Sequence, residues 1–249
     1  MRARPLLRAI RTVTVRSTTI VTLAALTAAG VGAQSGAPDA RPTVAVLYFT
    51  NGAISKNAEY APLSKGMAEM LITELAANTN IRVVERDRLQ SLLDEQNLGS
   101  SGRVEAGTAA RLGKTLGARH MLMGTFVIDT KEMMRVDVRA INTETSELEY
   151  ATSITGKADK MLAMLAELGT KVNAGLKLPA LPATTTPGAA TGGNGPNQMR
   201  AMMLIGRALE EQDQKRSAAA VTLLKEAVAA NPQNARAKTL LATAEKGSK

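Results

Sequence analysis

The chain has 249 residues, 45% of them apolar and 21% charged, so it can bury a core and is not disordered throughout. It has no cysteine, which excludes disulfides, thiolate metal sites, a cysteine nucleophile and an acylated amino-terminal cysteine. Aromatic residues make up only 2%, which argues against base-stacking platforms, and a single histidine, His120, argues against zinc sites and Ser-His-Asp catalysis. We therefore expect no enzyme and no bound cofactor or metal.

Residues 1–33 have the pattern of a secretory signal peptide. Five arginines and no acidic residue precede a mostly apolar stretch, Ile20–Val31, and small residues offer a cleavage site before Gln34. The stretch is shorter than the roughly 20 residues of a membrane span. An uncleaved anchor or a transit peptide is the alternative. Cleavage would remove the five arginines and lower the formal net charge from +9 to +4. We expect a periplasmic protein with no nucleic-acid partner and no transmembrane segment in the mature chain.

The mature chain begins with a strand–helix–strand pattern. Thr43–Phe49 is a Val-containing apolar run, typical of a buried strand. Pro62–Asn78 has apolar residues at helical spacing and is predicted to be an amphipathic helix. Ile81–Val84 is a short strand. This order predicts a parallel crossover connection.

Two further helices follow. Asp87 and Gln90 have the spacing of a capping box, which predicts that a helix begins there and continues to the break at Asn97–Gly102. The next helix runs from about Val104 to Leu116, and Gly117 is its predicted stop.

The pattern then changes to strands. The runs His120–Ile128, Met133–Asn142 and Leu148–Gly156 are separated by short polar turns, which predicts an antiparallel meander. A long helix, Met161–Leu176, ends this part of the chain. The prediction is a mixed α/β (α+β) fold, in which a mixed sheet of about five strands is packed by helices and followed by a small all-α tail.

Residues 179–197 are rich in Pro, Ala, Thr and Gly and predict a flexible linker with a root-mean-square span of roughly 25 Å. Residues 198–249 contain three predicted helices, Met199–Gln212, Ser217–Ala230 and Asn234–Lys246. The spacing of Ala220, Leu224, Ala227 and Pro232 resembles a tetratricopeptide repeat, whereas Arg207 and Glu211 stand where such repeats have large apolar residues. This is fewer than the roughly three repeats needed for independent stability, so the tail is expected to dock on the core, to pair with another copy, or to bind a partner helix.

Several segments together resemble the CsgG-like family, named after a curli-secretion component. They are Val44–Phe49, Leu63–Leu71, Val83–Leu89, Leu93–Leu98, Ala109–Ala118 and Met123–Phe126, and the resemblance covers about residues 43–178. It implies a fold like the amino-terminal domain of TolB. It also implies an envelope role, because relatives include curli and holdfast secretion channels, flagellar outer-membrane proteins, and lipoprotein activators of peptidoglycan synthases. None of these relatives is an enzyme.

The chain departs from the channel-forming members in two respects. The secretion channel is a lipoprotein, and this chain has no cysteine to acylate. The channel also inserts two hairpins per subunit into the membrane, and each membrane strand needs about 9–11 residues. The connections Asp129–Glu132 and Asn142–Glu147 are shorter and more polar than that. We therefore expect a protein that forms no pore by itself.

Two motifs favour structural interpretations. Gly113-Lys114-Thr115 resembles the end of a phosphate-binding loop, but the spacing from Gly107 is one residue too long and the surroundings predict a helix, with Gly113 at a close packing contact. The twelve methionines suggest a Cu(I) carrier as an alternative function. Because Met67, Met70, Met161 and Met164 fall on predicted core faces and Met202 and Met203 on an amphipathic face, core filling is favoured.

His120 is expected to be an ordinary strand-edge histidine.

The charged run Glu85, Arg86, Asp87 and Arg88 is the candidate functional site. Paired carboxylates for catalysis would need a substrate cleft that nothing else in the sequence indicates. Helix capping by Asp87, with Arg86 or Arg88 paired to nearby acids, is the favoured structural interpretation. In the light of the family resemblance, these four residues are candidate contacts with a partner or another subunit.

The sequence thus predicts a periplasmic protein that acts in envelope assembly or secretion by contacting other envelope proteins or itself. Peripheral association with the outer membrane and proximity to peptidoglycan are compatible with this prediction. A subunit of an oligomeric curli-type secretion channel and a methionine-based copper carrier are the alternatives.

Overall fold

The computed structural model describes residues 40–53, 56–98, 104–189, 191 and 197–247. The predicted signal peptide, residues 1–33, lies outside the described residues, as does most of the predicted break at Asn97–Gly102. The strands are β1 (Thr43–Val46), β2 (Thr50–Asn51), β3 (Arg82–Val83), β4 (His120–Ile128), β5 (Met133–Asn142) and β6 (Leu148–Lys157). The α-helices are α1 (Asn57–Tyr60), α2 (Leu63–Ala76), α3 (Arg86–Glu95), α4 (Ala106–Leu116), α5 (Met161–Gly175), α6 (Gln198–Asp213), α7 (Ser217–Ala230) and α8 (Ala235–Gly247), and a 3₁₀ turn, η1 (Ala158–Lys160), precedes α5.

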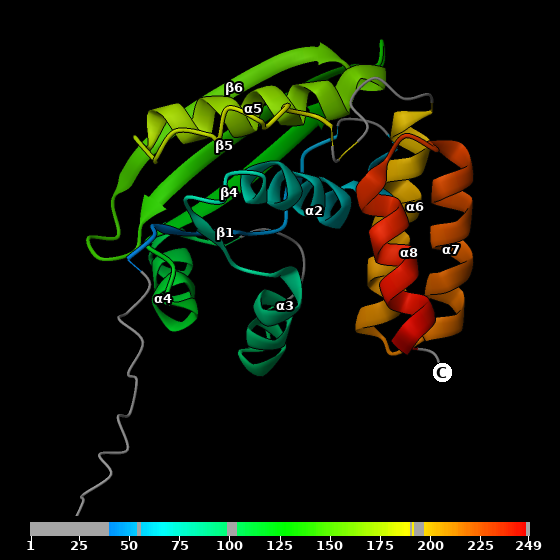
Figure 1. Cartoon of the computed structure of the whole chain (residues 1–249), viewed down its shortest axis with the longest axis horizontal. Coiled ribbons are helices and arrows are strands. Elements are labelled where there is room, and N and C mark those ends of the chain that lie inside the picture. The colour runs from blue at the N-terminus through cyan, green and yellow to red at the C-terminus, as the bar shows by residue number, and fades with distance from the viewer. Residues whose placement is uncertain (1–39, 54–55, 99–103, 190, 192–196, 248–249) are drawn as a thin grey trace, which may run out of the picture. The chain divides into compact units, whose positions relative to one another are not determined.

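The described strands form one six-stranded mixed sheet (Figure 1). Its order is β3-β1-β4-β5-β6, with the short β2 also beside β4. β1 is parallel to β3 and to β4, whereas β4, β5 and β6 form an antiparallel meander. The predicted mixed α/β fold, its parallel crossover and its meander are confirmed.

The first strand is shorter than the predicted run Thr43–Phe49. Leu47 N still donates a hydrogen bond to Leu122 O of β4, at 2.9 Å, but Phe49 N donates to Ser64 O of α2, at 3.1 Å. Because the backbone of Phe49 turns to α2, the strand is interrupted and resumes as β2.

Tight turns connect the meander. The Asp129 carboxylate accepts hydrogen bonds from the backbone N–H groups of Lys131 and Met133, and the Asn142 side-chain oxygen accepts one from Glu144 N. These polar side chains satisfy the turn backbone, as short Asx-type turns do.

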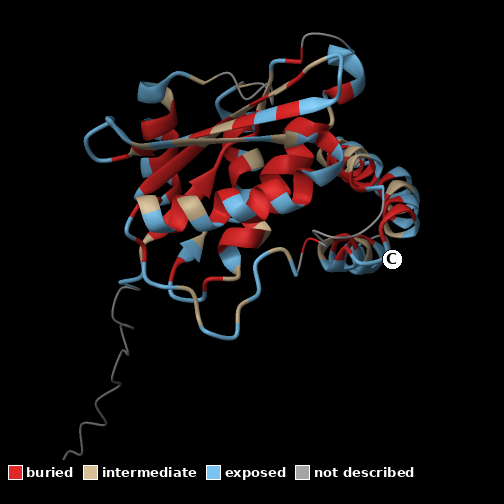
Figure 2. Ribbon diagram, turned by 90° about the horizontal axis from the view of Figure 1, so that it is seen from above, coloured by how far each residue is buried: buried red, intermediate tan, exposed pale blue. Residues whose placement is uncertain are grey.

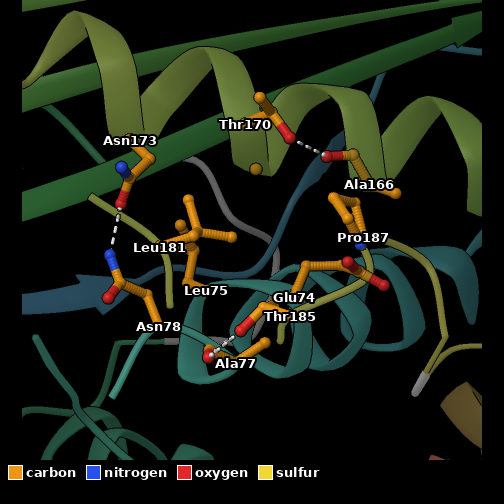
Figure 3. Close-up of a pocket in the computed structure, with 11 residues that line it drawn as sticks. Glu74, Leu75, Ala77, Asn78, Ala166, Thr170, Asn173, Leu181, Thr185 and Pro187 are labelled. Carbon is orange, nitrogen blue, oxygen red and sulfur yellow. Dashed lines mark hydrogen bonds between the residues drawn. The ribbon is translucent and has the colours of Figure 1, made fainter. Parts of the chain in front are cut away.

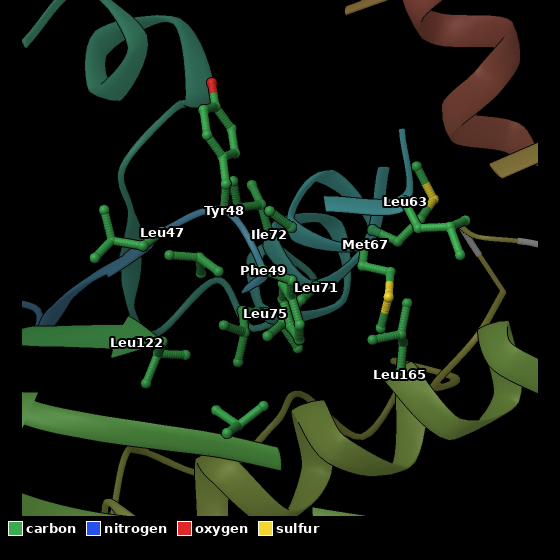
Figure 4. Close-up of a cluster of buried hydrophobic side chains, with 14 of the residues drawn as sticks. Leu47, Tyr48, Phe49, Leu63, Met67, Leu71, Ile72, Leu75, Leu122 and Leu165 are labelled. Atoms are coloured by element: carbon green, nitrogen blue, oxygen red, sulfur yellow. The ribbon is translucent and has the colours of Figure 1, made fainter. Parts of the chain in front are cut away.

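Helices cover both faces of the sheet. On one face, a Cβ added to Gly124 of β4 would lie 2.3 Å from the Phe49 ring, and one added to Gly156 of β6 would lie 3.0 Å from Met164 Sδ of α5. On the other face, a Cβ on Gly113 of α4 would lie 2.3 Å from Thr143 Cγ2. Successive residues along a strand point to opposite faces of the sheet, so these contacts place α5 on one side of the sheet and α4 on the other. α2 packs against β1 and α5. Buried apolar side chains fill the space between the sheet, α2 and α5 (Figure 4), and the same cluster continues into the other helices.

α2 is buried on all sides, which corrects the prediction of an amphipathic helix. Every residue from Leu63 to Ile72 is buried, including the charged Lys65 and Glu69. One side of α2 packs on the sheet and α5, and the opposite side packs on α6. Figure 2 shows this burial concentrated between the sheet and its covering helices, while the outer faces of the carboxy-terminal helices are exposed.

Two glycines let α2 and α6 approach closely. A Cβ on Gly66 would lie 2.7 Å from Met202 O, and a Cβ on Gly206 would lie 1.8 Å from Pro62 O. Neither position has room for a larger residue unless a backbone moves. The three predicted tail helices are present, and of the three expected arrangements of the tail the structure shows docking on the core.

The described part of the predicted linker follows the carboxy-terminal end of α2. Asn78 donates a hydrogen bond to Pro179 O, and Asn80 donates one to Ala180 O. Glu74 accepts hydrogen bonds from Gly188 N at 2.8 Å and from Thr191 Oγ1 at 2.5 Å. The sequence predicts a flexible segment here, and these described residues are instead bonded to the core.

Candidate functional site

The four candidate residues lie where α3 begins. Glu85 is the N-cap residue, and Glu85, Asp87 and Arg88 are exposed. Arg86 is buried, with 6% of its surface accessible. The structure therefore places three of the four side chains at the surface and turns the fourth into the protein.

The prediction that the Asp87 side chain caps α3 is wrong. No side-chain hydrogen bond caps α3, and Asp87 lies within its first turn. Its carboxylate instead accepts a hydrogen bond from Arg86 Nη2 at 2.6 Å. The predicted pairing of Arg86 with a nearby acid is confirmed by that contact.

Arg86 also reaches the tail. Its Nη1 donates to Asp213 Oδ1 of α6 at 2.8 Å and to Tyr48 Oη at 3.2 Å. The Tyr48 hydroxyl in turn donates to Gln90 Oε1 at 2.6 Å. Burial raises the pKa of Tyr48 well above its usual value, although the Arg86 charge opposes the shift, so the hydroxyl stays protonated as this donation requires.

Lys65 of α2 completes the cluster. Its ammonium donates to Asp213 Oδ2 at 2.6 Å and to Glu210 Oε2 at 2.5 Å, and it lies 5.4 Å from the centre of the Tyr48 ring. Both oxygens of Asp213 are thus occupied, one by a cation of α2 and the other by a cation of α3. We call Tyr48, Lys65, Arg86, Glu210 and Asp213 the tail clamp, because they join the core to α6.

A second ion pair lies along the same helix. Arg236 of α8 donates from Nε to Glu69 Oε1 of α2 at 2.6 Å, and Glu69 is only 1% exposed. Buried charges are tolerated when they are paired and hydrogen-bonded. Lys65 and Glu69 of α2 are therefore paired with oppositely charged residues of the tail.

A cleft of about 470 Å³ opens beside the tail clamp, between α3 on one side and α6 and α8 on the other. The α3 side presents Glu85, Asp87 and Asp94, and the tail side presents Lys215 and Arg236. Its lining is mixed and strongly charged, which suits a polypeptide surface better than an apolar small molecule.

A smaller pocket between α2 and α5 is nearly filled (Figure 3). Leu181, Thr185 and Pro187 of the predicted linker lie in it, and Asn78 bonds Asn173 across it at 2.8 Å. Its remaining volume of about 10 Å³ has room for roughly one water molecule. This pocket is a packing contact and not a ligand site.

The other motifs of the sequence lie in a helix or in the core. Gly113-Lys114-Thr115 lies within α4, and Gly113 is at a close contact, both as predicted. Met67, Met70, Met161, Met164 and Met202 are buried in the core, as predicted. Within the described residues there is no group of three or more His, Asp or Glu side chains that could hold a metal ion.

The expectation for His120 is wrong. His120 begins the inner strand β4 and is 4% exposed, and its Nδ1 lies 2.8 Å from Glu149 Oε2 of β6. The buried histidine therefore has a carboxylate partner two strands away, on the exposed residue Glu149, which no local pattern could reveal.

Comparison with known proteins finds a similarity in part of the chain. Residues 26–128 match the family model of the curli production assembly/transport component CsgG. This segment is similar to that family. The match ends at the last residue of β4, so β5, β6, α5 and the tail lie beyond the CsgG-like match. No curated protein matches the chain.

Solved structures are similar to part of the chain at low sequence identity. The LpoB carboxy-terminal domain of Salmonella enterica is 13% identical, the match covers 47% of this chain and 82% of that domain, and the TM-score is 0.35. Lipoprotein GNA1162 of Neisseria meningitidis is 13% identical, with coverages of 53% and 96% and a TM-score of 0.40. The PelC dodecamer of Paraburkholderia phytofirmans is 16% identical, with coverages of 55% and 89% and a TM-score of 0.34. These similarities assign no activity.

Among the described residues, no helix is both long and apolar enough to cross a bilayer.

Proposed function

We propose that this protein is exported to the periplasm and acts, without chemistry of its own, as a CsgG-like adaptor that binds other envelope proteins during assembly or secretion. The observation that carries the proposal is the match of residues 26–128 to a family described by assembly and transport. The matched segment includes α3, and Glu85, Asp87 and Asp94 line the cleft beside the tail, whereas Arg88 is exposed outside its lining.

In this proposal the exposed residues Glu85, Asp87 and Arg88 contact the partner, and Arg86 has a different task. Because Arg86 is buried in the tail clamp, it fixes α3 relative to α6 and thereby sets the width of the cleft. The body at 43–178 and the tetratricopeptide-like segment at 198–249 then form the two walls against which a partner would lie. Those domain boundaries are part of the proposal.

Photo-crosslinking in intact cells tests this function. A photoreactive amino acid replaces Glu85 or Arg88 in the full chain, and a control variant carries it at Lys114, which is exposed on α4. We expect the same envelope protein to be attached at Glu85 and at Arg88 but not at Lys114. Fractionation of the same cells should place the protein with the periplasm or the envelope.

Two results would overturn the proposal. One is recovery of the protein in the cytosolic fraction. The other is a crosslinking pattern at Glu85 and Arg88 that is no different from the pattern at Lys114.

A further inference from the structure

The outer side of β6 is an open sheet edge. β6 pairs with β5 on one side, and no other strand of the described chain pairs with it on the other. Between Tyr150 and Gly156 the strand has no charged residue and no proline, which are the features that natural sheets use to prevent pairing at an edge. This stretch is therefore suited to accept a further strand.

The register shows which backbone groups point outward. Ala158 N donates to Glu132 O at 2.9 Å, and in the same register Val136 lies opposite Ile154. Backbone groups of successive residues in an antiparallel strand point to opposite sides. The N–H and C=O groups of Ala151, Ser153 and Thr155 are thus directed away from β5.

We propose that a second copy of this chain pairs its β6 with this edge, antiparallel, about a two-fold axis at Ser153. In this register Ser153 faces the partner's Ser153, Ala151 faces the partner's Thr155, and all three outward-directed residues form hydrogen-bonded pairs. The contact uses the same surface on both copies, so it closes as a dimer and does not propagate.

The charges at the ends of β6 favour the antiparallel orientation. Glu147 and Glu149 lie at one end, and Lys157, Asp159 and Lys160 lie at the other, which keeps a net positive charge. Antiparallel pairing brings the acidic end of each strand beside the basic end of its partner, whereas parallel pairing in register would place like charges together. This self-complementarity is the reason for choosing a second copy over an unrelated strand.

Side chains fit the same register. Tyr150 would lie opposite the partner's Gly156, on the face of the sheet that α5 covers. Leu148 and Met133 are exposed large apolar residues, at 57% and 37%. Met133 lies beside Lys157 in the β5–β6 register, and the partner's Leu148 would approach the other side of Lys157. Pairing would therefore cover both apolar side chains.

Single cysteines test the register, because the chain contains none of its own. The Cα atoms of a hydrogen-bonded pair lie about 5.5 Å apart, which is within the range of a disulfide. Oxidised full-length Ser153→Cys should form a covalent dimer. Ala151→Cys and Thr155→Cys should crosslink when mixed but not alone, and Thr222→Cys, exposed on α7, is the control. The proposal fails if Ser153→Cys crosslinks no more than this control, or if Ala151→Cys alone crosslinks as well as the mixture.

Charge variants test the association itself by sedimentation velocity on the full chain. Ser153→Lys places two lysines opposite each other and should weaken dimerisation about tenfold or more. Lys157→Glu should also weaken it, because in this register Lys157 faces the partner's Glu149. Lys238→Glu on α8 is the matched control, and circular dichroism checks that each variant is folded.

Two outcomes would overturn the proposal: a wild-type chain that stays monomeric over its soluble concentration range, or a dimer that Ser153→Lys leaves intact. Neither result bears on the partner crosslinks at α3.

Discussion

Asp213 and Arg86 form a 2.8 Å ion pair between residues that lie 127 positions apart in the sequence. The same carboxylate also binds Lys65, so one acidic residue of α6 holds cations of α2 and α3 together. The side chains of all three are at most 10% exposed. Asp213 therefore helps to hold α6 against α2 and α3, beside the cleft.

Asp213→Asn should therefore destabilise the protein strongly. The amide keeps the shape of the carboxylate but leaves Lys65 and Arg86 without their shared anion, and removing one partner of a buried ion pair typically costs about 3–5 kcal/mol. Urea denaturation should show a loss of this size in the free energy of unfolding.

Glu211→Gln is the matched control for that measurement. Glu211 is a nearby acid on α6, and its partner, Arg216, is about half exposed. Such surface ion pairs contribute about 0–1 kcal/mol to the free energy of unfolding. Equal losses in the two variants would contradict the role assigned to Asp213.

Gly206→Ala should also destabilise the protein, for a steric reason. The added methyl group would lie 1.8 Å from Pro62 O, so α6 or the residues before α2 must move. Overpacking of this kind costs about 1–3 kcal/mol. Thermal unfolding should show a lower midpoint, and limited proteolysis should cut the tail faster than in the wild type.

Gly107→Ala, in contrast, should leave the stability of the protein unchanged or raise it. Nothing lies within 4 Å of a Cβ at this position in α4, and alanine is the better helix former by about 0.5–1 kcal/mol. An unchanged or raised midpoint in this control, with a lowered midpoint in Gly206→Ala, would attribute the effect to the crossing of α2 and α6.

Local patterns predicted most of the fold. The strand β5 alternates buried Met134, Val136 and Val138 with more exposed residues, and this alternation is visible in the sequence. Gly117 ends α4 with a φ of 67°, a conformation that glycine adopts without strain. Such features depend on neighbours in the chain, so the sequence alone can reveal them.

The tail clamp could not be predicted in this way. Lys65 and Glu69 stand on a helix that is apolar on most sides, and their partners Asp213 and Arg236 are far along the chain. Only their placement amid apolar residues indicates that another element covers them. Of the four candidate residues, Arg86 joins this cluster because α6 supplies an anion, which no pattern around Glu85–Arg88 reveals.

Glu74→Gln should loosen the segment that connects α5 to α6. The Glu74 carboxylate is 8% exposed and accepts hydrogen bonds from Gly188 N and Thr191 Oγ1, whereas an amide can accept through only one of its two terminal atoms. Leaving one buried donor unsatisfied costs about 1–3 kcal/mol. We expect faster protease cleavage within residues 179–197.

Glu167→Gln on α5 is the control for this variant, because Glu167 is exposed and pairs only with Lys171 on its own helix. If both variants are cleaved at the wild-type rate, the bonds to Glu74 do not hold the segment, and the prediction of a flexible linker gains support.

The tail clamp should also make stability depend on pH. Partial burial acts to raise the pKa of Glu210, but hydrogen bonds from Lys65 and Gln214 outweigh it, so its pKa in the folded protein lies below the ordinary value of 4.5. Below about pH 4.5 the unfolded chain therefore binds a proton that the folded chain does not yet bind, and unfolding becomes more favourable. The contribution of Glu210 to stability is complete above this pH and is lost as the pH falls through the pKa of Glu210 in the folded protein.

Glu210→Gln should flatten the decrease of the thermal midpoint over this acidic range, while Glu226→Gln, exposed on α7, should leave the decrease unchanged. Identical pH profiles for wild type and Glu210→Gln would show that Lys65 does not hold Glu210 in its ionised form.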